Sequence, residues 1–446
     1  ASILYAMLPS GGITSAWTAI RLVLVLGIGL MAIARVREAS FVAVASIPFV
    51  GVIGRTGIVD RPVSEILVIA VVGAWIVRSI VSGQFGSVRG RWFVLGGYFV
   101  LAAVAAALLA DFPKFAFRDL RTVILEPLAL FFVLISVLRD RRDIRRLLTA
   151  FVGGVGLVAV VALILIPAGG VVTELTPPRL RGTFGSPNNL ALVLERAIPI
   201  GIALIVSART WRTPWTSVLL LLVGVLIATW SRGAWVGTLV GVAIAAVPLL
   251  KSFGARYALI GIAGFGAMAT GVVVAAGGDR LATFFRFGDG TVFSRLSVWD
   301  AAWRMLGDHW VFGLGPDNFL THYRAYMRPD AWREPNISHP HNLVFDAWLS
   351  TGIFGLIALL LILVLFWKTW KRARYRANGE LDPYTFGVGG AMLATLVHGL
   401  VDHSYFLPEL AAVFWMLVAA GVLLHRSNEP KCSPRSSGGT DSAAIV

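Results

Sequence analysis

The chain has 446 residues, of which 57% are hydrophobic and 14% are charged, and it carries a formal net charge of +15. Its mean hydropathy is +0.78. A soluble domain has about 25% charged residues, so the composition excludes an ordinary soluble protein. The single cysteine, Cys432, excludes an intramolecular disulfide framework and a cysteine-based metal centre.

Long apolar runs predict an all-α, polytopic helical membrane protein. Runs such as residues 22–34 and 356–367 belong to segments that can cross a hydrocarbon core of roughly 30 Å. They lack the polar–apolar alternation of membrane β-barrel strands. We expect about 12 to 14 transmembrane helices and one large external loop containing amphipathic helices. In chain order, the predicted spans are residues 16–34, 40–55, 64–80, 92–110, 121–138, 147–167, 188–208, 216–231, 233–250, 257–276, 352–368, 385–402 and 407–425.

Lysine and arginine are concentrated in alternate loops. The basic segments are residues 35–37, 78–91, 139–146, 209–212, 251–256, 368–376 and the tail after His425. Because basic loops stay in the cytoplasm, residues 111–120, 171–187 and 277–350 are predicted to face outside. The positive net charge then reflects topology and attraction to anionic membrane lipids, and it requires no nucleic-acid partner.

These features divide the chain into four parts. We expect N-terminal transmembrane helices over residues 1–276, an external loop with the catalytic residues over 277–350, C-terminal transmembrane helices over 351–427 and a disordered cytoplasmic tail over 428–446. An insert as long as 277–350 is costly to keep ordered unless it has a function. The active site is therefore expected there.

The insert contains a predicted amphipathic helix on the membrane surface. Ser294 is a suitable N-cap. Apolar residues then recur at helical spacing, namely Leu296, Trp299, Trp303 and Leu306. Arg295 would stand at the helix N-terminus, where backbone N–H groups and the helix dipole favour an anion. Arg295 is therefore either an anion ligand or an exposed surface arginine.

Arg232 lies between two apolar runs that leave no room for a loop, near the predicted outer surface. A cation there is costly unless it is paired, hydrated or snorkelling. Arg232 could reach the interface between Trp230 and Trp235. Alternatively it binds an anion, because a guanidinium holds phosphate oxygens bidentately and stays protonated.

His341 follows Pro340 and stands where the next helix is expected to begin. Histidine titrates near neutral pH, which suits a general base. His341 could instead be a hydrogen-bonded interfacial residue, or it could form a metal-binding pair with His339. No acidic or cysteine cluster is adjacent in sequence, so no metal is expected. Other polar groups near span ends are expected to form structural pairs, namely Arg118, Asp119, Arg121 and Glu126 in one span, and Asp402 with His403 in a later one.

Three motifs, taken in order, resemble the O-antigen ligase and polymerase superfamily. They are SRGAW at 231–235, SRLSVWDAAWRM followed by FGLGPDNF within 294–319, and HPHN continuing into WLSTGIFGL at 339–356. The resemblance covers roughly residues 180–405 and includes one large external loop between two late spans.

The resemblance implies roles for particular residues. Arg232 and Arg295 would be the two arginines that act on a glycan linked to polyprenyl diphosphate, and His341 would be the histidine of the site. Arg181 would be a supporting basic residue. The family is described as metal-independent, and no cofactor is implied. We also expect Trp299 and His339 to contribute to substrate binding.

The resemblance further implies an inverting glycosyltransferase of the O-antigen ligase type. Its donor would be a glycan on undecaprenyl diphosphate and its acceptor lipid A–core or another glycan, at the outer face of the bacterial inner membrane. Polymerisation of surface polysaccharide and protein O-glycosylation stay open, because both use the same donor. A lipid-linked glycan flippase is the alternative from another class. Transporters place charges near the bilayer midplane, whereas these charges are predicted at one surface, which favours an enzyme.

Overall fold

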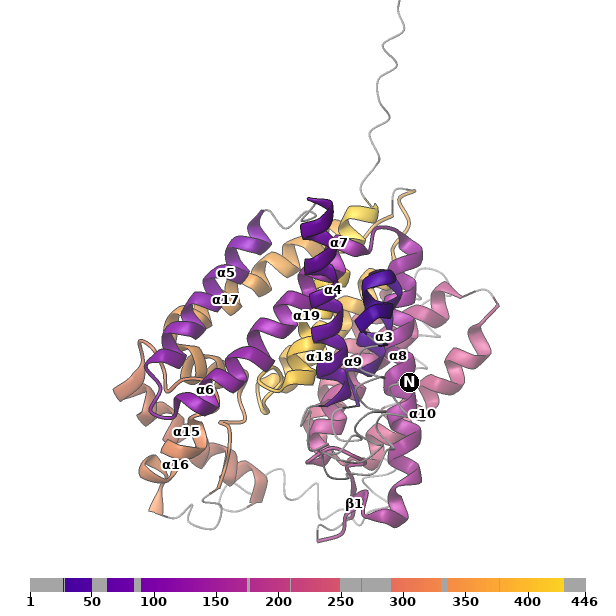
Figure 1. Ribbon diagram of the computed structural model, residues 1–446. Coiled ribbons are helices and arrows are strands. Elements are labelled where there is room, and N and C mark those ends of the chain that lie inside the picture. Colours follow the sequence, from indigo (N-terminus) through magenta and orange to yellow (C-terminus); the bar gives the residue numbers. More distant parts are fainter. Residues whose placement is uncertain are drawn as a thin grey trace, which may run out of the picture.

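The computed structural model describes residues 29–49, 62–83, 90–174, 177–208, 210–248, 290–329, 336–376 and 378–428, together with residues 27 and 266. These residues are almost entirely helical (Figure 1). The elements are α3 (Val36–Ser46), α4 (Val63–Ser82), α5 (Arg91–Leu108), α6 (Pro113–Asp119), η1 (Leu120–Leu125), α7 (Glu126–Val137), α8 (Arg141–Ile164), η2 (Ile166–Ala168), β1 (Val171–Val172), β2 (Arg179–Leu180), α9 (Pro187–Ser207), α10 (Arg212–Ala228), α11 (Arg232–Ala245), α15 (Gly290–His309), α16 (Phe319–Tyr326), α17 (Leu343–Ala373), α18 (Pro383–Gly399) and α19 (Pro408–Asn428).

The polytopic helical fold is confirmed. Among the described residues, seven helices are long and apolar enough to cross a membrane, and α10 and α11 are shorter apolar helices. The seven are Val63–Ser82, Arg91–Leu108, Pro113–Val137, Arg141–Ile164, Pro187–Ser207, Leu343–Ala373 and Pro408–Asn428. The predicted spans 16–34, 40–55 and 257–276 lie partly or almost wholly outside the described residues, as does the tail beyond Asn428.

The third of these helices begins earlier than the predicted span 121–138. It runs from Pro113 to Val137 and contains the π-helical turn η1. Pro127 follows directly in α7, and a proline lacks the N–H that a regular helix requires. A π-turn next to a proline is one way to continue such a helix.

Four helices form the centre of the bundle. The middle of α9 is buried on every side, and in α19 89% of the most apolar 18-residue stretch is buried. α11 and α18 approach so closely that a Cβ on Gly241 would lie 2.6 Å from the carbonyl oxygen of Gly390. The α9 and α11 N-termini, the end of α18 and the start of α19 meet at one end of the bundle, where the polar cluster described below lies.

The insert packs on the outer part of α17. Backbone hydrogen bonds join Leu314 N to Leu349 O at 2.6 Å and Ile353 N to Val311 O at 3.1 Å. α17 is kinked between these contacts at Gly352, which has φ 69° and ψ −179°, a conformation open essentially to glycine alone. The kink lies next to residues 350 and 351, where the external loop was predicted to end and the C-terminal transmembrane helices to begin. The helix itself begins at Leu343, inside the predicted loop.

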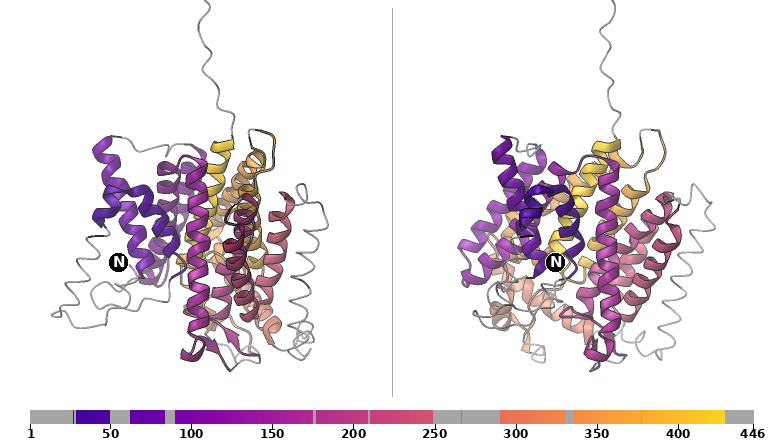
Figure 2. Two further views of the ribbon diagram at one scale, coloured as in Figure 1. Left: turned by 90° about the vertical axis from the view of Figure 1, so that its right-hand side faces the viewer. Right: turned by 45° about the vertical axis from the view of Figure 1, so that its right-hand side comes forward.

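The two ends of the bundle differ in character. α15, α16 and the β1–β2 hairpin lie at one end, opposite the end where α19 finishes (Figures 1 and 2). At that opposite end, Arg37 pairs with Asp143, and Arg141 pairs with Asp382. Arg141 also donates to Asn428 at 2.7 Å. The basic segments 35–37, 139–146 and 368–376 therefore gather at the end away from the insert.

Candidate active site

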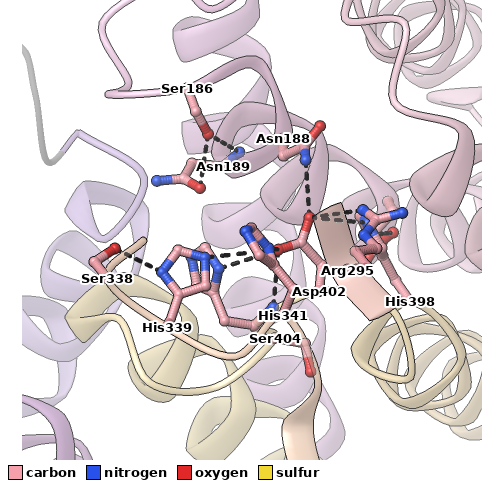
Figure 3. A network of polar contacts seen from close by, with 12 residues as sticks. Ser186, Asn188, Asn189, Arg295, Ser338, His339, His341, His398, Asp402 and Ser404 are labelled. Atoms are coloured by element: carbon pink, nitrogen blue, oxygen red, sulfur yellow. Dashed lines mark hydrogen bonds and ion pairs between the residues drawn. The ribbon is translucent and has the colours of Figure 1, made fainter. Parts of the chain in front are cut away.

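Asp402 is the centre of a buried polar cluster at the insert end of the bundle (Figure 3). It follows α18, and its side chain is 0% exposed. Its Oδ1 accepts hydrogen bonds from His341 Nδ1 at 2.9 Å and from the backbone N–H of His403 at 2.9 Å. Its Oδ2 accepts one from Asn188 at 2.8 Å. These partners come from three segments far apart in the sequence.

Asp402 is held as a carboxylate. Burial alone would raise its pKa, but the contacts with His341 and His403 outweigh burial and hold the pKa well below its usual value. Only the Asp402–His403 pair was predicted from sequence, as a structural pair. The wider role of Asp402 was missed. The sequence feature that could have indicated this role is an acidic residue beside a histidine at the end of a predicted span.

Three histidines lie close to Oδ1 of Asp402. The rings of His339 and His341 lie 4.3 Å apart between centroids, and those of His339 and His403 lie 3.6 Å apart. His403 Nδ1 is 3.1 Å from Asp402 Oδ1, and His339 Nε2 is 4.0 Å from it. Desolvation lowers the pKa of His339 well below its ordinary value, and the neighbouring His403 and His341 add to this effect. The sequence predicted the proximity of His339 and His341, but not that of His403.

Arg295 reaches the cluster from the insert. Its Nη2 lies 3.7 Å from Asp402 Oδ2, and 21% of its side chain is exposed. Burial lowers its pKa, and Asp402 opposes this shift. The predicted helix start at Ser294 is wrong, because α15 begins at Gly290. Arg295 therefore lies within the helix, and the helix dipole does not explain its position.

The predicted apolar stripe of α15 also needs correction. The buried face consists of Val298, Ala301, Ala302 and Met305 with Leu306. Leu296 and Trp303 are 43% and 62% exposed, so they point away from that core. Small alanines face the neighbouring elements because they allow close packing. Trp299 is half-buried, and its Nε1 has no hydrogen-bond partner among the residues that the structure describes.

Arg232 begins α11 directly beside the cluster. A Cβ on the next residue, Gly233, would lie 2.5 Å from the His398 ring, so the start of α11 contacts that histidine. His398 Nε2 lies 3.8 Å from Asp402 Oδ2, and His398 Nδ1 contacts Glu195 at 2.8 Å. The tight turn before α11 uses a left-handed backbone at Trp230, with φ 52°. The side chain of Arg232 is half-buried.

The hairpin β1–β2 contributes a different arginine from the one predicted. Arg181 donates to Gly169 O at distances of 3.3 and 3.4 Å, within its own segment. Arg179 donates to Asn188 Oδ1 at 2.6 Å and to Thr229 O at 2.8 Å. Asn188 in turn donates to Asp402. Arg179, which the sequence reasoning missed, is thus linked to the cluster.

The cluster has the ligand types of a metal site. His339, His341, Asp402 and His403 each offer one ligand atom, and these atoms lie within 4.8 Å of one another. Imidazole nitrogens and a carboxylate suit a divalent transition metal such as zinc. No acidic residue stands next to His339 and His341 in the sequence. The fold brings Asp402 to them from 61 positions beyond His341.

Comparison with known families bears on this site. Residues 217–360 match a family model described as O-antigen ligase, and this range includes Arg232, Arg295, His339 and His341. No curated protein matches the chain. The predicted resemblance is confirmed over the matched range. Residues 217–360 are therefore similar to the O-antigen ligase family, which supports a membrane enzyme of the O-antigen ligase or polymerase type.

Proposed function

We propose that the protein transfers a glycan from undecaprenyl diphosphate to an acceptor hydroxyl at the outer face of the bacterial inner membrane, as an O-antigen ligase with lipid A–core as acceptor. One observation carries this proposal. Arg295 and His341, from the two ends of the insert, converge on opposite oxygens of the buried Asp402. A cation for the leaving group and a base for the nucleophile are thus held by one carboxylate.

The donor diphosphate would bind on the arginine side of the cluster. Arg295 and the N-terminus of α11, which begins with Arg232, both lie there. Helix N–H groups and guanidinium forks favour phosphate oxygens. As the anomeric C–O bond breaks, its electron pair leaves with the diphosphate, and these groups stabilise the growing charge.

The acceptor would be activated by His341. Its Nδ1 donates to Asp402, which leaves Nε2 as the basic nitrogen. Nε2 accepts the hydroxyl proton while the acceptor oxygen bonds to the anomeric carbon. A single displacement inverts that carbon. His341 has a left-handed backbone, with φ 48°, and such conformations in non-glycine residues are frequent at functional sites.

The test is transfer by purified protein with a defined undecaprenyl-diphosphate glycan. Three acceptors are compared, namely lipid A–core, a second lipid-linked repeat unit and a serine-containing peptide. We expect product with lipid A–core. Product only with the repeat unit or the peptide would reassign the enzyme as a polymerase or a protein glycosyltransferase. Movement of the donor across the membrane of proteoliposomes, without any transfer, would identify the protein as a flippase instead of an enzyme.

A further inference from the structure

A cavity of about 500 Å³ lies next to the histidines. Its lining includes His339 and His403, and neither Arg232 nor Arg295 belongs to it. Figure 3 shows the same asymmetry, with Arg295 and His398 on one side of Asp402 and Ser338 with His339 on the other. The cavity therefore opens on the histidine side of the cluster. Its volume lies in the range of small-molecule binding sites, about 300–1,000 Å³.

The arginines of the cavity wall are already paired with carboxylates. Arg118 contacts Asp119 at 3.0 Å and also pairs with Asp317. Arg121 contacts Glu65 at 2.6 Å and also pairs with Glu126. Both cations are thus neutralised by acidic partners. A wall of this kind does not favour a phosphate group, because its carboxylates repel an anion.

Asp346 adds a polar group that needs a partner. It lies in the first turn of α17, lines the cavity and is 4% exposed. Its Oδ2 has no hydrogen-bond partner among the described residues. A buried polar atom without a partner is costly, and a hydroxyl donor in the cavity would remove that cost. Asp346 N bonds to Asn342 O at 2.9 Å, so Asp346 lies one helical turn beyond the His341 loop.

The rest of the lining suits a carbohydrate. Ser338, Ser350 and Thr122 supply hydroxyl groups, while Phe319 and Phe406 supply aromatic rings. Hydroxyls and carboxylates can bond to sugar hydroxyls, and aromatic rings can cover the apolar faces of a sugar. The cavity wall thus combines many polar groups with two aromatic rings.

We propose that this cavity binds the acceptor as a neutral, hydroxyl-rich sugar, and that a side-chain oxygen of Asp346 accepts a hydrogen bond from one of its hydroxyls. The inference rests on the proposed transfer reaction. It places the acceptor on the histidine side and the diphosphate on the arginine side of Asp402. The acceptor oxygen then approaches from the side opposite the leaving group, as inversion requires.

The test separates sugar binding from transfer. Binding of a dephosphorylated core oligosaccharide is measured in nanodiscs for wild-type protein, Asp346→Ala and Asp346→Asn. The matched control is Asp300→Asn, since Asp300 pairs with Arg304 on α15 and does not line the cavity. We expect about a tenfold weaker affinity for Asp346→Ala, as for the loss of one hydrogen bond. Asp346→Asn should lose less, because its amide oxygen still accepts, and Asp300→Asn should match wild type.

Kinetics provide the second measurement. Asp346→Ala should raise the acceptor KM about tenfold while the donor KM stays within about twofold. Unchanged oligosaccharide binding, equal losses for donor and acceptor, or tighter binding of the phosphorylated oligosaccharide would each overturn the assignment. If Asp346→Ala weakens sugar binding while wild-type protein transfers to no acceptor, the proposed reaction fails and the sugar site stands.

Discussion

At the residue scale, the cluster depends on Asp402, which orients His341. Replacing Asp402 by Asn removes the negative charge and allows an amide N–H to face His341, so the His341 proton is no longer fixed on Nδ1. In a hydrolase triad the equivalent change costs about 10⁴-fold in rate through the wrong histidine tautomer. We expect Asp402→Asn to lose about 10²–10⁴-fold in transfer rate, with donor binding within a few fold of wild type. Near-normal turnover would remove Asp402 from the mechanism.

The two arginines allow a conservative test. Lys supplies a point charge without the planar fork of Arg, so Arg232→Lys and Arg295→Lys should lose most transfer while the protein still folds and inserts. Arg304→Lys is the control, because Arg304 lies on the same helix as Arg295 and pairs with Asp300. It should transfer at the wild-type rate. Normal turnover in both site variants would exclude a bidentate diphosphate clamp.

His341 and His339 should differ in their effects. A general base contributes about 10²–10⁴-fold to rate, so His341→Ala should slow transfer by that factor and leave donor affinity within a few fold. His339→Ala should have a smaller effect. Donor binding and transfer are measured separately for each variant. A His341→Ala protein that loses only donor affinity would identify His341 as a binding residue.

Chelation distinguishes a base from a metal ligand in the same cluster. We expect the transfer rate to be unchanged after EDTA treatment. If a metal bound to His339, His341, Asp402 and His403 were required, chelation would abolish transfer and zinc would restore it. In that case alanine at each of the three histidines would reduce the transfer rate to a similar extent. This would contradict the different effects expected for His341 and His339.

Sequence reasoning singled out Arg232 between two apolar runs, Arg295 in the insert and His341 before a predicted helix, and the structure brings Arg295 and His341 to one carboxylate. It missed the partners that link them. Asp402 is 61 positions from His341 and 214 positions from Asn188. Contacts over such separations are set by how the helices pack, and periodicity along one segment contains no information about them.

At the element scale, α15 shows why a stripe of large side chains can mislead. Leu296 and Trp303 have the right spacing for an apolar face but are exposed, and of the predicted stripe only Leu306 belongs to the buried face, with Val298, Ala301, Ala302 and Met305. The exposed side chains of Leu296 and Trp303 can contact lipid headgroups, where tryptophan is favoured. Periodicity predicted that a helix exists, whereas packing decided which face of it is buried.

The kink of α17 is a second feature of this scale. Gly352→Ala would place a side chain in a conformation reserved for glycine and against Val311 O. We expect the loop at 310–314 to detach, with a lower midpoint of thermal unfolding and reduced transfer. The backbone conformation at Gly352 alone costs about 1–3 kcal/mol for an L-residue.

Gly307→Ala is the control for this change. Gly307 lies in α15, and a Cβ there meets nothing within 4 Å. Alanine in a helix interior is favoured over glycine by about 0.5–1 kcal/mol, so the control should be at least as stable as wild type. Equal behaviour of the two variants would show that the kink does not position the insert.

At the scale of the whole molecule, the arrangement of basic segments predicts that the insert faces outside. In a Cys432→Ser background, Gly307→Cys should react with an impermeant thiol reagent in intact spheroplasts. Glu380→Cys, in the predicted cytoplasmic loop between α17 and α18, should react only after permeabilisation. The reverse pattern would invert the topology and place the cluster in the cytoplasm.

Hydropathy was sufficient to predict most of the described spans, because crossing a bilayer demands long apolar helices. It was less informative about the start of the Pro113–Val137 helix, where charged residues pair with one another. The bonds of Arg121 to Glu65 and Glu126 allow that helix to carry charges near its N-terminal end. The predicted pairing of Arg121 with Glu126 is confirmed. The adjacent pair Arg118 and Asp119 also forms, although the predicted spacing of three to five positions did not include it.

The order of the cluster residues along the chain has a consequence for biosynthesis. Asn188, Arg232, Arg295 and His341 leave the ribosome first, and Asp402, which joins them, follows 61 positions after His341. At about 5–20 residues per second, this delay is roughly 3–12 s. During that interval His341 and Arg295 lack the carboxylate that both of them contact in the folded protein. A nascent chain would therefore become competent for transfer only when its last helical hairpin has entered the membrane.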